Sequence, residues 1–88
     1  MNFQADITIM PLPEILDPQG KAVTLGLQNL GIDGVVEVRM GKQVQMRLSA
    51  ATAEEAEEKV ILACQKLLCN PIMETYTFVV RAIEEVQI

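Results

Sequence analysis

The most reactive side chains in this sequence are two cysteines, Cys64 and Cys69, which lie five residues apart near the expected end of a helix. A thiolate at a helix C-terminus faces the negative end of the helix dipole, which raises the thiol pKa. The position therefore argues against a catalytic thiol. We expect both cysteines to be free thiols in a cytosolic chain, because cytosolic disulfides are rare. The sequence contains no histidine, which excludes a histidine-activated nucleophile or a histidine-ligated metal.

Charged residues offer little more chemistry. Four glutamates crowd the start of an expected helix: Glu54, Glu55, Glu57 and Glu58. They are typical of a solvated face, and their charge is favourable near a helix N-terminus. Lys42 follows Gly41 at an expected tight turn, where it could contact a phosphate, although a hairpin lysine more often serves only solubility. The sequence has neither a phosphate-binding loop nor a Cys-x-x-Cys metal motif, so we expect no metal and no catalytic residue.

The composition is that of one small globular domain, which we place at residues 1–88. Half of the residues are hydrophobic but only 3% are aromatic, which predicts an aliphatic core with apolar surface left for a partner. The net charge of −5 excludes the basic face of a nucleic-acid binder. No apolar run is long enough to span a membrane, and we expect no signal peptide, because the first residues lack a basic region before an apolar stretch.

Periodicity and turn residues predict six elements. Alternating apolar residues indicate four strands, and helical spacing with caps indicates two helices. The second helix would begin with a capping box formed by Thr52 and Glu55. In chain order these are a strand at 4–10, a helix at 18–30, strands at 35–40 and 44–49, a helix at 52–68 and a strand at 75–80. Gly41 and Lys42 would connect the second and third strands as an antiparallel hairpin. The tail, residues 82–88, would extend the last strand or fray.

The order strand–helix–strand–strand–helix–strand favours an α+β, ferredoxin-like βαββαβ sandwich. In this fold two helices cover one face of a four-stranded antiparallel sheet, and the second and fourth strands lie at the edges. The expected fourth strand is apolar and weakly protected against edge pairing. The uncovered sheet face would also need shelter, so we expect the chain to associate with itself.

Three short motifs are candidates for contact with a partner. The first is the corner Asp17, Pro18, Gln19 and Gly20, the second is Gly41 and Lys42, and the third is Asn70 and Pro71. Folding alone accounts for Asp17 as a helix N-cap, for Pro18 in the first turn, and for Asn70 and Pro71 as a helix stop. Gln19 and Gly20 are less well explained, because a glycine in a first turn implies that another group approaches the backbone. We therefore expect Gln19 and Gly20 to make contacts.

Four motifs taken together resemble the small S subunit of phosphoribosylformylglycinamidine synthase. They lie at residues 15–23, 30–31, 38–42 and 64–74, and the resemblance spans about residues 3 to 82. It implies a non-catalytic subunit of a ligase complex in the fourth step of de novo purine biosynthesis. It further implies dimers or tetramers, a cytoplasmic location, and partners that do the chemistry. A large synthase subunit would bind ATP, Mg²⁺ and substrate, and a glutaminase subunit would make ammonia that the small subunit helps to shelter.

The sequence departs from this family at two places. Residues 10–14 stand where the family usually has a lysine before the corner, so a contact by that lysine is in doubt. Cys69 stands where a small residue such as alanine is common.

Two other hypotheses stay open. One is a regulatory domain that binds a metabolite between paired ferredoxin-like units. The other is an acylphosphatase-like enzyme, although Pro11 and Pro13 remove two N–H donors from the loop that would hold its anion.

Overall fold

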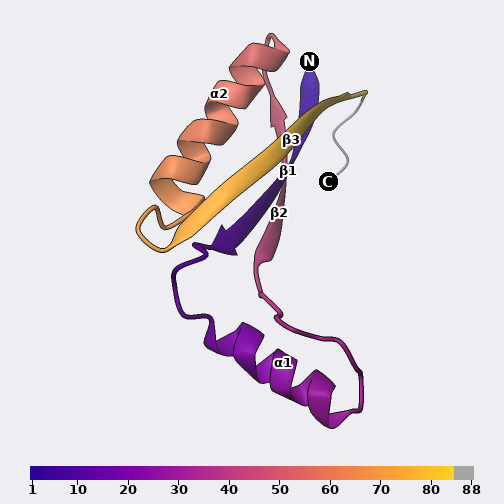
Figure 1. Cartoon of the computed structure of the whole chain (residues 1–88). Helices are drawn as coiled ribbons and strands as arrows, with labels where there is room; N and C mark the ends of the chain where they lie inside the picture. Colours follow the sequence, from indigo (N-terminus) through magenta and orange to yellow (C-terminus); the bar gives the residue numbers. More distant parts are fainter. Residues whose placement is uncertain (85–88) are drawn as a thin grey trace.

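The computed structural model describes residues 1–84 and contains a three-stranded sheet, two α-helices and one π-helical turn (Figure 1). In chain order the elements are β1 (Asn2–Pro11), α1 (Pro18–Asn29), β2 (Lys42–Ser49), α2 (Ala53–Ala63), η1 (Cys64–Leu68) and β3 (Glu74–Ile83). The expected tail at residues 82–88 falls partly on β3 and partly on residues 85–88, which lie outside the described residues.

β1 is the central strand of the sheet, whose order is β2-β1-β3 with both pairings antiparallel. Its alternate residues Phe3, Ala5, Ile7 and Ile9 are all buried on one face, which fits the period of two of a half-covered strand. The register places Val44 and Phe78 on either side of Ile7. These side chains form the aliphatic core that the composition predicts.

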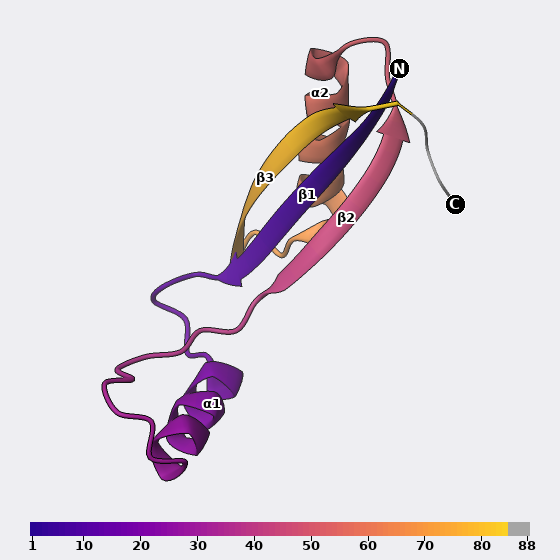
Figure 2. The same cartoon turned by 90° about the vertical axis from the view of Figure 1, so that its right-hand side faces the viewer.

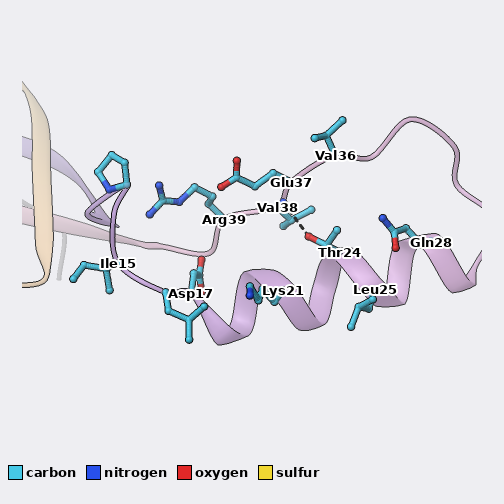
Figure 3. Close-up of a pocket in the computed structure, with 12 residues that line it drawn as sticks. Ile15, Asp17, Lys21, Thr24, Leu25, Gln28, Val36, Glu37, Val38 and Arg39 are labelled. Carbon is cyan, nitrogen blue, oxygen red and sulfur yellow. Dashed lines mark hydrogen bonds between the residues drawn. The ribbon is translucent and has the colours of Figure 1, made fainter.

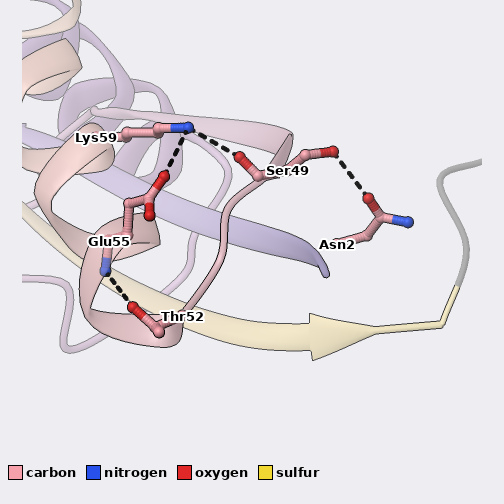
Figure 4. A network of polar contacts seen from close by, with 5 residues as sticks. All are labelled: Asn2, Ser49, Thr52, Glu55 and Lys59. Atoms are coloured by element: carbon pink, nitrogen blue, oxygen red, sulfur yellow. Dashed lines mark hydrogen bonds and ion pairs between the residues drawn. The ribbon is translucent and has the colours of Figure 1, made fainter.

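α2 covers the apolar face of the sheet. Thr52 caps it by accepting a hydrogen bond from the Glu55 amide at 3.1 Å, as the capping-box pattern predicts. Lys59 links the helix to β2 by donating to the Ser49 carbonyl at 3.0 Å, and it pairs with Glu55 at 3.3 Å (Figure 4). The buried residues Val60 and Cys64 pack against β1. The expected helix at 52–68 is therefore present, but its last turn widens into η1.

The prediction of a four-stranded, ferredoxin-like sheet is wrong. Residues 35–40 belong to no strand, and the sheet has three strands. A two-residue hairpin at Gly41 and Lys42 would need a left-handed backbone, but positive φ among the glycines occurs only at Gly31 and Gly34. The chain does not reverse at Gly41. It continues into β2, where Lys42 already pairs with Ile9.

The prediction that both helices cover one face is also wrong. α1 stands beyond the end of the sheet, side by side with residues 35–40 (Figures 1 and 2). We call α1 and residues 30–40 the arm. The radius of gyration is 16.8 Å, whereas a compact chain of this length would measure about 12 Å. Val36, Val38 and Met40 alternate as residues of a strand do, but no strand of the sheet pairs with this segment.

The edge strands and the uncovered face of the sheet are the two features from which self-association was expected. The last strand, β3, is an edge strand as expected, whereas the other edge is β2. The uncovered face is polar, with Asp6, Thr8, Gln45 and Thr77 among its residues. That face needs little shelter from water, so it no longer supports self-association.

Candidate docking site at the base of the arm

The arm is joined to the sheet through Asp17. One carboxylate oxygen accepts from the Gly20 amide at 2.9 Å, and the other accepts from the Met40 amide at 2.9 Å. These bonds, the Gly20 bond above all, hold the pKa of Asp17 below its ordinary value. Asp17 thus caps α1 as the sequence predicts, and it also fastens residues 35–40 to the helix.

Gly20 is buried because the arm itself approaches its backbone. A Cβ at this position would overlap the Val38 carbonyl oxygen and would lie 2.6 Å from the Asp17 carboxylate. The approaching group expected from the sequence is therefore part of this chain. Its neighbour Thr24 donates to the Gly20 carbonyl at 2.8 Å and accepts from the Val38 amide at 3.0 Å.

Gly41 and Lys42 lie where the arm re-enters the sheet. A Cβ on Gly41 would overlap Met10 and the Ile9 carbonyl oxygen, so glycine is required there by close packing. Lys42 begins β2, and its ammonium lies 3.8 Å from a carboxylate oxygen of Glu74 on β3. Because Lys42 is more than half exposed, this pair contributes little to stability.

Asn70 organises the turn between η1 and β3. Its side-chain oxygen accepts a hydrogen bond from the Ile72 backbone amide at 3.0 Å, and its backbone amide donates to the Glu74 carboxylate at 2.8 Å. The same turn contacts the loop after β1, since the Leu12 amide donates to the Met73 carbonyl at 2.9 Å. The turn is thus held against the base of the arm.

These three motifs meet at one hollow of about 490 Å³, which we call the base hollow. Six of the eight candidate residues line it: Asp17, Pro18, Gln19, Gly41, Lys42 and Asn70. Gly20 is buried and does not line it. Pro71 lies instead at a separate hollow of about 380 Å³ beside Cys64 and Cys69. Most of the remaining wall is apolar, from Ile9, Pro11, Ile15, Leu16, Met40 and Met73.

A second hollow of about 530 Å³ lies along the arm, between α1 and residues 36–39 (Figure 3). Its wall includes large exposed apolar side chains, among them Leu25 and Val36. Sequence reasoning missed this hollow because it placed residues 35–40 inside the sheet. The exposed apolar side of α1, at Leu25, was the available signal, since that side has no sheet to cover.

Residues 4–82 match the family model of PurS, phosphoribosylformylglycinamidine (FGAM) synthase. The chain belongs to the PurS family. It is 39% identical over 83 residues to the curated PurS subunit of this synthase from Synechocystis, covering 94% of this chain and 83% of that protein. It is thus a subunit of FGAM synthase, a ligase of purine biosynthesis.

Solved PurS structures have the same fold. A crystal structure of Methanocaldococcus jannaschii PurS, described as one of the subunits of formylglycinamide ribonucleotide amidotransferase, matches with a TM-score of 0.83 at 30% identity. The match covers 93% of this chain and 99% of that one. A chain of the Thermotoga maritima PurLQS structure matches with a TM-score of 0.86 at 28% identity, covering 92% and 99%.

Residues 1–84 hold no cluster of three or more cysteine or acidic residues that could bind a metal ion, and no helix there is long and apolar enough to cross a membrane. Burial raises the pKa of both thiols, with Cys69 adding to the effect at Cys64. The Gly20 amide in the first turn of α1 donates to the Asp17 carboxylate, so this amide is not free to hold an anion.

Proposed function

We propose that this chain is a non-catalytic bridging subunit of FGAM synthase, placed between a large synthase subunit and a glutaminase subunit. Among solved structures it is similar to a chain of the Thermotoga maritima PurLQS structure, which supports an assembly of this kind. The chemistry would belong to the partners. ATP and Mg²⁺ would bind the large subunit, and this chain would carry no cofactor.

The observation that carries the proposal is the convergence of three separate motifs on the base hollow. Asp17, Gly41 and Asn70 hold the wall in place through contacts within the chain. Gln19 and Lys42 are different, because no hydrogen bond within the described residues uses the Gln19 side chain, and Lys42 makes only a long ion pair. The wall is therefore fixed by contacts within the chain, while the side chains of Gln19 and Lys42 remain available to bind a partner. Such a preorganised surface is suited to docking.

Sheltering ammonia is the second part of the proposal. A glutamine-dependent ligase must keep ammonia away from bulk water, where it would be protonated and lost. A subunit with exposed apolar side chains at its hollows, such as Leu16 and Leu25, can close such a route without reacting with ammonia. The proposal includes a cytoplasmic location, which a role in purine biosynthesis supports.

The competing hypothesis of a regulatory metabolite-binding domain rested on paired ferredoxin-like units. The three-stranded sheet and the detached α1 remove that basis. A thermal-shift assay with amino acids and nucleotides separates the two ideas, since a bridging subunit shows no ligand-dependent stabilisation.

The experiment compares Gln19→Ala with Gln45→Ala in the reconstituted complex. Gln45 is the matched control, because it is an exposed glutamine on β2 whose side chain lies on the polar face of the sheet. Gln19→Ala should weaken capture of the two partners and lower glutamine-dependent synthesis, while synthesis from added ammonia by the large subunit is affected less. Equal capture and equal glutamine-dependent rates for the two variants would contradict the proposal.

A further inference from the structure

α2 covers one face of the sheet and leaves the other open (Figure 2). A row of three polar side chains crosses this open face, one from each strand. Gln4 on β1 lies opposite Arg47 on β2 and opposite Arg81 on β3, and residues directly opposite each other share a face. Because neighbouring strands are about 4.8 Å apart, the two arginines flank Gln4 with their Cα atoms about 10 Å apart.

Gln4, in the middle of this row, is only 7% exposed although α2 lies on the opposite face. Its amide nitrogen donates to the Asp6 carboxylate at 3.1 Å, and the Arg47 Nε lies 3.5 Å from its amide oxygen. The Arg47 side chain therefore leans inward from the edge strand, toward the middle of the open face.

Further hydrogen-bond donors lie around this row. Arg81 is exposed, and no hydrogen bond or ion pair within residues 1–84 uses its guanidinium. Asn2, on the same face, accepts a hydrogen bond from the Ser49 hydroxyl at 2.9 Å through its side-chain oxygen (Figure 4), so its amide nitrogen keeps two N–H donors. Among the residues paired in this face, Asp6 is the only acidic one. The face is therefore rich in donors and poor in negative charge.

The charge of the open face is opposite to that of the rest of the molecule. The whole chain has a net charge of −5, and α2 on the other face exposes Glu54, Glu57 and Glu58. An acidic partner is therefore repelled by the helix side of the chain and attracted to the arginines of the open face. Such an uneven charge distribution orients a partner as it approaches.

We propose that the open face of the sheet docks an acidic segment of one partner subunit, whose carboxylates meet Arg81 and Arg47. The segment presents two carboxylates about 10 Å apart, which is the separation of acidic residues seven positions apart on a helix, since each residue advances about 1.5 Å. Arginine holds a carboxylate through two parallel N–H bonds. The same contact covers Val79, which lies beside Asp6 on this face and is 66% exposed.

This inference rests on the proposed bridging function and gives it a second surface. The row at Gln4 and the base hollow at Pro11 lie toward opposite ends of β1, about 20 Å apart along the strand. A subunit that bridges two partners needs two separate surfaces of this kind. Because the base hollow is mostly apolar and the open face is polar and cationic, the two surfaces select partners of different chemistry.

The test measures the Kd of the full chain for the large subunit and for the glutaminase subunit, each alone and then together. Arg81→Ala should raise the Kd for one of the two partners about five-fold or more and leave the other unchanged, because one charge pair is lost. The difference from wild type should shrink as the salt concentration rises, because salt screens exposed charges. Arg81→Lys keeps the charge without the planar fork and should weaken binding less than Arg81→Ala.

Two variants serve as controls. Lys66→Ala removes an exposed positive charge from η1, away from the open face. Gln45→Ala is a neutral change on the open face itself, where the contact depends on charge and most surrounding residues contribute little. Both variants should bind the two partners as wild type does.

The outcomes separate this inference from the bridging function. Equal Kd values of wild type and Arg81→Ala for both partners would refute the acidic contact and leave the bridging function intact. A wild-type chain that binds neither partner would refute both. A smaller particle mass of Arg81→Ala by light scattering, with partner binding unchanged, would assign the open face to a second copy of the chain and overturn the inference.

Arginine labelling locates the contact without a mutation. Phenylglyoxal should modify Arg81 in the free chain, because its guanidinium is exposed, and should modify it several-fold more slowly in the complex, where a carboxylate covers it. Equal labelling of Arg81 in the free chain and in the complex would also overturn the inference.

Discussion

Arg39 donates a hydrogen bond from its guanidinium to the carbonyl oxygen of Pro11, 28 residues earlier in the chain, at 2.7 Å. The same nitrogen donates to the Leu12 carbonyl at 2.9 Å. Arg39, on the segment that returns from α1 to β2, therefore fixes the loop that leads from β1 to α1. Together with Asp17, it sets the angle at which α1 leaves the sheet.

The first prediction concerns this tie. Arg39→Ala should lower the free energy of unfolding by about 1–2 kcal/mol, because hydrogen bonds from a charged group to carbonyls are lost. It should also speed amide exchange at Val38 and Met40, whose amides are bonded to α1. Urea unfolding and hydrogen exchange measure the two effects. Arg81→Ala on β3 is the control, and equal exchange in both variants would show that Arg39 does not hold the arm.

The second prediction separates two glycines of α1. Gly20→Ala should destabilise the chain by about 1–3 kcal/mol, because the added methyl group overlaps the Val38 carbonyl and forces the arm apart. Gly26→Ala should stabilise it by about 0.5–1 kcal/mol, because nothing lies within 4 Å of the new Cβ and alanine is the better helix former. Thermal unfolding of the two variants should thus change in opposite directions. Stabilisation by Gly20→Ala would show that its Cβ has room.

The third prediction is a pH dependence centred on Asp17. Hydrogen bonds from Gly20 and Met40 lower its pKa in the folded chain from an ordinary value of 3.8. A depressed folded pKa contributes stability that is present above pH 3.8 and is lost as the pH falls through the folded pKa. Wild type should therefore be more stable than Asp17→Asn near neutral pH, and the difference should shrink below pH 3.8.

Thermal melts of both proteins from neutral to strongly acidic pH measure this difference. Asp33→Asn, at an exposed position between α1 and residues 35–40, is the control. A gap between wild type and Asp17→Asn that stays constant across the acidic range would contradict the assignment.

The fourth prediction concerns the two thiols. Cys64 and Cys69 are buried, and burial raises the pKa of each. Both should react with a disulfide reagent at pH 8 more slowly in the native chain than in denaturant, because burial restricts access to each thiol and lowers its thiolate population. Rapid labelling of either thiol in the native chain would reopen the question of a reactive cysteine.

The sequence by itself determined those features that depend on residues close together in the chain. The Asp17 cap, the Thr52 cap and the alternation in β1 each depend on neighbours a few residues away, so each could be predicted and is confirmed. The family assignment likewise follows from motifs in order along the chain, and the match at residues 4–82 confirms it.

Only the tertiary structure decided where residues 35–40 and α1 lie. Their periodicity is correct for a strand and a helix, but periodicity does not say which backbone groups become hydrogen-bonding partners. The amides of Val38 and Met40 bond to Thr24 and Asp17, side chains that are 14 and 23 residues away. The Gly41 backbone lies against Ile9 and keeps a conformation that cannot reverse the chain. These contacts between distant residues give the chain an arm in place of a fourth strand.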